Sequence, residues 1–149
     1  MEKFIPEVKS KLRTRIIEVP QVIYKASGIK VLGTRIKSLL FSTDIAIIKN
    51  TNANSIIAVY PFTPQLSITQ ALLEVAPVPV FVGVGGGITT GRRSIEIALQ
   101  AELMGAYGAV VNAPTKNDVI NEMYERIDIP IIATIVSEHD DYKGKLDAG

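Results

Sequence analysis

Three consecutive glycines between an apolar run and a helical pattern constrain this chain more than any other feature. The apolar run at residues 79–84 has the length of a strand, Gly85-Gly86-Gly87 follow it, and a helical pattern begins near Thr90. Glycine lets the backbone adopt positive φ and approach a ligand closely. The helix would present free N–H groups and the positive end of its dipole to the same space. The segment therefore predicts a strand–turn–helix unit whose turn can hold a phosphate.

A purely structural interpretation of the same glycines is also open. Tight turns between a strand and a helix need glycine, and glycine lets a helix pack closely on a strand. Arg92 and Arg93 follow in the first helical turn, where acidic side chains are normally preferred. A bound anion would offset these two cations, although both arginines can equally lie on the surface.

Short apolar runs and amphipathic stretches alternate along the chain from Lys37 onward. The runs are nearly continuous in Ile, Val and Ala, which is typical of strands that are buried on both faces of a parallel sheet. Their alternation with helical patterns predicts an α/β fold. The predicted strands are residues 38–42, 55–60, 79–84, 109–112 and 130–136.

A helix is expected after each of these strands. The longest is predicted over residues 90–104, with Leu103 among its buried side chains and Gly105 ending it. Residues 115–118 have the spacing of a capping box, which predicts that Thr115 caps the next helix.

The chain is interpreted as a single α/β domain over residues 1–149. Residues 1–36 form an N-terminal helical or irregular segment, in which residues 4–15 have the pattern of a polar helix. Residues 37–149 supply five β/α units.

Composition excludes several classes of protein. With 47% hydrophobic and 21% charged residues, the chain has the composition of a globular domain. It has no cysteine, which removes disulfides and thiolate nucleophiles. No apolar run approaches the roughly 20 residues of a membrane span, and the start lacks a signal-peptide pattern. A net charge of +1 gives no general attraction to nucleic acid or membranes, so a cytoplasmic protein with neither partner is expected.

Five parallel strands with helices fit two architectures. One is a flavodoxin-like open sheet, and the other is part of a (β/α)₈ barrel, which needs about 250 residues. The chain ends in Leu146-Asp147-Ala148-Gly149, a helix end with a capping glycine that normally leads into another strand. This favours a TIM barrel of which about five of the eight units are present. Because an incomplete barrel has two open edges, a homo-oligomer is a further expectation.

Two glycine-containing stretches carry a family resemblance. Gly85-Gly86-Gly87-Ile88-Thr89-Thr90-Gly91, followed by Gly105-Ala106-Tyr107-Gly108-Ala109-Val110-Val111, resembles the phosphate-binding unit of ribulose-phosphate-binding and FMN-linked TIM barrels. In those families, backbone amides of both loops and a helix N-terminus hold the phosphate. The resemblance implies that Gly86, Gly87 and Ile88, flanked by residues 89–91, form the first phosphate loop, and that residues 112–114 form the second. Together with the cation argument, the predicted phosphate site is formed by these residues: Gly85, Gly86, Gly87, Ile88, Thr89, Thr90, Gly91, Arg92 and Asn112.

Candidate catalytic residues follow other predicted strands, where barrels place their chemistry. Asp44 could be a general base, but an aspartate in this position is also a common helix N-cap. His139 is the only histidine, and it lies beside Glu138 in a group suited to acid–base work. The same acidic residues are also typical of an ordinary helix N-terminus. No metal-binding or serine-hydrolase motif is present, and the sequence implies no particular cofactor.

The sequence therefore predicts a TIM-barrel protein that binds a small phosphorylated metabolite. An aldolase, isomerase or hydrolase using Asp44, Glu138 and His139 is the enzymatic form of this hypothesis. Two alternatives stay open: a barrel that binds FMN through the glycine loop, and a non-enzymatic scaffold that binds a phosphometabolite or a partner chain.

Overall fold

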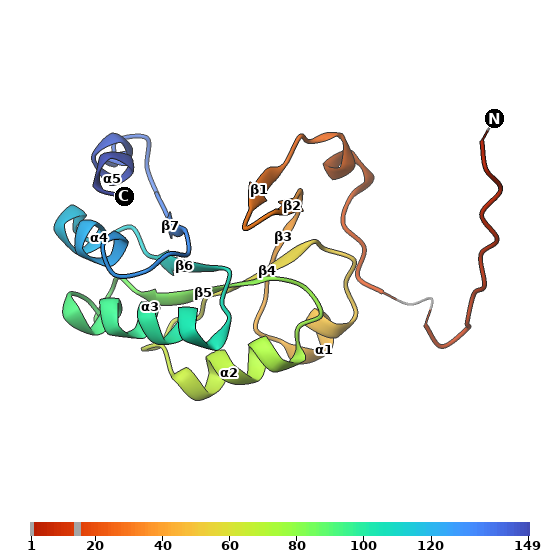
Figure 1. The fold of residues 1–149 in the computed structure, drawn as a ribbon, viewed down its shortest axis with the longest axis horizontal. Coiled ribbons are helices and arrows are strands. Elements are labelled where there is room, and N and C mark those ends of the chain that lie inside the picture. The colour runs from red at the N-terminus through yellow and green to blue at the C-terminus, as the bar shows by residue number, and fades with distance from the viewer. Residues whose placement is uncertain (1, 14–15) are drawn as a thin grey trace.

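The computed structural model describes residues 2–13 and 16–149, and its centre is a five-stranded parallel sheet (Figure 1). The strands follow one another in space as they do in the sequence, in the order β3-β4-β5-β6-β7. Every predicted strand is present close to its expected position, which confirms the α/β class and the parallel sheet. The bounds are β3 (Leu39–Phe41), β4 (Ser55–Ala58), β5 (Val80–Gly85), β6 (Gly108–Val111) and β7 (Ile131–Ala133).

A helix follows each strand, and the helices form one layer. Each helix contacts the next one along the chain, from α1 to α5. Their buried side chains join a single core cluster with one face of the sheet. Figure 1 shows α1 to α4 on one side of the strands. The bounds are α1 (Ile45–Lys49), α2 (Leu66–Val75), α3 (Arg92–Met104), α4 (Asn117–Tyr124) and α5 (Tyr142–Ala148).

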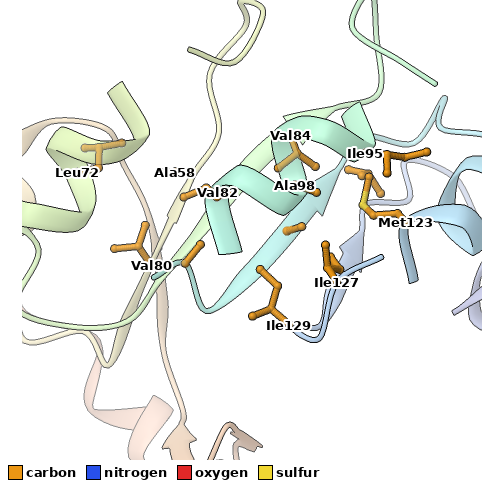
Figure 2. Packing of buried hydrophobic residues seen from close by; sticks show 14 of the residues in the cluster. Ala58, Leu72, Val80, Val82, Val84, Ile95, Ala98, Met123, Ile127 and Ile129 are labelled. Carbon is orange, nitrogen blue, oxygen red and sulfur yellow. The ribbon is translucent and has the colours of Figure 1, made fainter. Parts of the chain in front are cut away.

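The main core lies between this helix layer and the sheet (Figure 2). Val80, Val82 and Val84 alternate along β5 and all point into it, as the two-residue period of a strand requires. Leu72 of α2 and Ile95 of α3 pack against them. The helices therefore cover the face of the sheet on which Val80, Val82 and Val84 lie.

A β-hairpin covers part of the opposite face. Strands β1 (Ile29–Val31) and β2 (Thr34–Ile36) pair in antiparallel fashion, and Ile36 is buried against Ile57, Phe81 and Val110. The tip of the hairpin lies beside residues 127–131, which lead into β7. The hairpin is therefore at the amino ends of the parallel strands and leaves their carboxyl ends clear.

The expected N-terminal helix is not formed. Residues 2–13 contain no helix, while Thr14 and Arg15 lie outside the described residues. Phe4, Val8 and Leu12 are almost fully exposed, and Figure 1 shows this segment standing away from the sheet. A helix of this length is marginal in water without a surface to pack on, which explains the difference. The first helical turn of the described chain is the 3₁₀ helix Gln21–Lys25.

The side chains buried along α3 differ from the prediction at one position, Leu103. Ile95, Ala98 and Ala101 form its buried face, and Gly105 ends it in the left-handed conformation with φ 105°, as predicted. Leu103, expected in the core, is 72% exposed. At 100° per residue it lies about 140° around the helix from Ala98, away from the buried face.

Within the described part of the chain, no helix is both long enough and apolar enough to cross a membrane.

Candidate functional site

The carboxyl ends of three neighbouring strands enclose a pocket of about 440 Å³. Residues 59–64, which follow β4, form one wall, and the glycine loop after β5 forms the other. Asn112, directly after β6, closes the third side. This is the edge of a parallel α/β sheet at which ligands bind. The glycine loop that the sequence singled out thus lines a pocket in the place expected for a ligand site.

Glycine is required at the start of this loop by backbone geometry. Gly85 and Gly86 have φ of 143° and 116°, a region that other residues rarely adopt. The Gly86 N–H donates to the Thr89 carbonyl at 2.7 Å, which closes the turn. A Cβ on Gly86 would lie 2.5 Å from both the Asn112 nitrogen and Thr115 Oγ1. The β5–α3 and β6–α4 loops therefore touch through Gly86, which has no room for a side chain.

Beyond Gly86 the loop carries backbone donors without acceptors. In the described chain, no backbone N–H of residues 87–91 makes a hydrogen bond to protein. Helix α3 begins next, with Gly91 as its N-cap at φ 61°, no side-chain cap and no acid in its first turn. A run of unpaired N–H groups therefore leads directly into the positive end of a helix dipole, an arrangement that favours an anion.

Neutral polar groups complete the pocket. The Tyr60 hydroxyl accepts from the Gln65 N–H at 2.9 Å, which leaves its own proton to donate. Thr63 accepts from the Thr89 hydroxyl at 2.9 Å and likewise keeps a proton. The Asn112 carboxamide has no partner in the described chain. No charged side chain is among the described residues that line the pocket, so its polarity comes from hydroxyls, one amide and the backbone.

Most of the predicted phosphate residues lie at the pocket. Gly85, Gly87, Ile88, Thr89 and Asn112 line it, and Thr90 and Gly91 continue the loop to α3. Gly86 is buried against the β6–α4 loop.

Arg92 is not among the residues that line the pocket. Its side chain is exposed, and its Nε lies 3.6 Å from Glu96 Oε1, one turn further along the same helix. Arg93 is exposed as well. Any effect of these arginines on an anion would therefore act through their charge at the start of α3.

Asp44 serves as the N-cap of α1. Its Oδ1 accepts from the N–H groups of Ala46 and Ile47 at 2.8 and 3.2 Å. Asp44 does not line the pocket. The geometry therefore shows the capping role that the sequence left open, and a part in catalysis stays a prediction.

His139 and Glu138 lie in the loop between β7 and α5. Their side chains are 87% and 88% exposed, and His139 Nε2 lies 3.8 Å from Glu138 Oε1. Neither lines the pocket, and acid–base work by this pair also stays a prediction. Among the described residues, no group of three or more His, Cys, Asp or Glu side chains could hold a metal ion.

The neighbouring aspartates organise this part of the chain. Asp140 accepts from the N–H groups of Val136 and Ser137, and Asp141 caps α5. A hydrogen bond from the Gly144 N–H and a second from Asn117 lower the pKa of Asp141. Asp140 and Asp141 therefore cap a turn and a helix, as expected if these acidic residues mark an ordinary helix N-terminus.

Two buried groups at the loop between β6 and α4 were not found from the sequence. The prediction that Thr115 caps α4 is wrong. The N-cap of α4 is Lys116, and Thr115 Oγ1 is buried without a hydrogen-bond partner among the described residues. Lys145 of α5 reaches the same loop, and its Nζ donates to the carbonyls of Ala113 and Thr115 at 3.1 and 2.9 Å. A lysine in a polar helix carries no local signal of burial, so sequence patterns could not identify it.

No family model matches the chain, and no curated protein matches it in sequence.

Proposed function

We propose that this protein binds a small phosphorylated metabolite at the carboxyl end of its sheet. The phosphate would lie against the free N–H groups of residues 87–91 and the start of α3. This run of unpaired donors at a pocket is the observation that carries the proposal, because backbone amides and a helix dipole suffice to bind phosphate. It requires no charged side chain in the pocket.

The rest of the pocket suits the remainder of such a ligand. A volume of about 440 Å³ falls within the range of small-molecule sites. Tyr60, Thr63 and Asn112 offer neutral hydrogen-bonding groups, while Phe62 and Ile88 leave apolar side chains exposed beside them. A metabolite with hydroxyl or carbonyl groups attached to its phosphate fits this mixture.

The arrangement of the elements supports the barrel hypothesis over the flavodoxin-like alternative. In a doubly wound sheet the strand order reverses and helices cover both faces. Here the order follows the sequence and the five helices share one layer, as in consecutive units of a (β/α)₈ barrel. In that architecture, ligands bind at the carboxyl ends of the strands.

The described residues that line the pocket can bind a ligand, but none of them has an acidic, basic or histidine side chain. Asp44, Glu138 and His139 would need to reach a ligand from outside the pocket to act as acid or base. An aldolase, isomerase or hydrolase is therefore the enzymatic form of the proposal, and substitution of these residues is its direct test.

Reversing a charge at the start of α3 tests the phosphate site. Arg93→Glu should weaken the affinity for inorganic phosphate about fivefold, because an acidic side chain in the first turn competes with the anion for the helix dipole. The free energy of unfolding should change by less than about 1 kcal/mol, since the residue is exposed. Calorimetric titration measures the affinity and urea unfolding the stability.

The matched control is Lys30→Glu, which makes the same change in charge on the hairpin at the other end of the sheet. It should leave phosphate affinity unchanged. Equal weakening by both variants would show a nonspecific charge effect. A wild-type protein that binds neither inorganic phosphate nor any phosphorylated metabolite would overturn the proposal.

A further inference from the structure

Lys145 is a buried cation that binds one loop of the candidate site. It is 9% exposed, although it belongs to the short terminal helix α5. Its Nζ contacts two carbonyl oxygens, of Ala113 and Thr115, in the loop between β6 and α4. This is the loop that begins with Asn112 at the pocket.

The ammonium group of Lys145 has no carboxylate in direct contact among the described residues, although its charge interacts with the Asp141 carboxylate. Asp141, one turn earlier on α5, accepts instead from Gly144 and Asn117. Buried charges are normally paired, because removing an ion from water is costly. The charge of Lys145 is therefore held by two carbonyl dipoles of the loop and by the Asp141 carboxylate, which it does not touch directly.

A continuous set of contacts joins this charge to the glycine loop. The Thr115 N–H donates to the Asn112 carbonyl, and the Asn112 N–H donates to the Gly85 carbonyl, each at 3.0 Å. Thr115 and Asn112 also pack directly against Gly86. The loop that Lys145 holds is therefore the one that closes the pocket beside the free N–H groups.

We propose that Lys145 is a positioning residue of the anion site, which rests on the proposed function. By drawing two carbonyl oxygens of the β6–α4 loop toward Nζ, it fixes Asn112 at the pocket and holds those oxygens in place. Its positive charge also attracts an anion bound at residues 87–91, because electrostatic effects are weakly screened in the protein interior.

Three variants test this role by titration with inorganic phosphate. Lys145→Met, which keeps the length but removes the charge, should weaken phosphate affinity roughly tenfold and reduce its dependence on ionic strength. Lys145→Arg should restore most of the affinity. The control is Glu102→Gln, because Glu102 Oε2 ties the loop before β7 through the N–H groups of Asp128 and Ile129. Glu102→Gln should lower stability without changing affinity.

A second measurement uses the wild-type protein and does not depend on a variant that folds. The ¹³Cε resonance of Lys145 should move on titration with phosphate, while that of the exposed Lys143 should not. If wild-type protein binds phosphate but Lys145→Met binds equally well, or the Lys145 resonance stays still, the role of Lys145 is overturned and the proposed function stands. If wild-type protein binds neither inorganic phosphate nor any phosphorylated metabolite, the proposed function fails, and this inference fails with it.

Discussion

Gly86→Ala should destabilise the protein by about 3 kcal/mol and abolish measurable phosphate binding. Gly86 has φ of 116°, where an alanine is strained by about 1–3 kcal/mol. Its new Cβ would also lie 2.5 Å from Asn112 N and Thr115 Oγ1, so the β6–α4 loop would have to move. Because that loop closes the pocket, stability and binding should fall together. Urea unfolding and calorimetric titration measure the two effects.

The adjacent glycine provides the control. A Cβ on Gly87 would meet no atom within 4 Å, and Gly87 does not have positive φ. Gly87→Ala should change the free energy of unfolding by less than about 0.5 kcal/mol. Similar losses of stability in Gly86→Ala and Gly87→Ala would contradict the role assigned to close contact between the two loops.

Phe81→Ala should cost about 3–5 kcal/mol, a large part of the stability of a domain of this size. Phe81 is fully buried on the sheet face opposite the helices, and its ring meets that of Tyr107 edge-on at 6.5 Å. It packs closely against Gly108, where a Cβ would lie 2.5 Å from the ring. Removing the ring would leave a cavity between the hairpin and the centre of the sheet. Thermal and urea unfolding measure the loss.

Phe41→Ala is the matched substitution on the same face. Phe41 pairs with Ile57, which in turn pairs with Phe81, but Phe41 lies on the edge strand and is 66% exposed. We expect a cost below about 1 kcal/mol, because little apolar area returns to water. A comparable cost at both positions would mean that the edge strand is covered in solution, as a homo-oligomer would require.

Sequence patterns predicted the strands, the glycine turn and one helix cap, because each of these features is determined by neighbouring residues in the chain. Apolar runs of strand length gave all five parallel strands, and the glycines predicted a turn whose positive φ the structure contains. Asp44 was recognised as a potential N-cap from its position after a strand, and it caps α1. Each of these features depends on a few neighbouring residues.

Features that depend on distant parts of the chain could not be predicted in this way. Local periodicity is the same for a singly and a doubly wound sheet, so it left the strand order open. The isolated N-terminal segment was wrongly predicted as helical because its pattern lacks a surface to pack on. Thr115 was assigned to a capping box, yet its backbone carbonyl binds Lys145, thirty residues away. The conformation of the β6–α4 loop therefore depends on tertiary contacts that local patterns do not reveal.

A titration of ¹⁵N-labelled protein with inorganic phosphate, followed by NMR, tests whether the glycine loop binds an anion. Binding at the proposed site should shift the amide resonances of residues 87–94 and the side-chain amide of Asn112, and it should saturate with one affinity. Sulfate should produce the same pattern at the same residues, since backbone N–H groups bind either anion. Phosphate that leaves these resonances unchanged, or shifts only exposed lysines and arginines elsewhere, would show that the glycine loop is not an anion site.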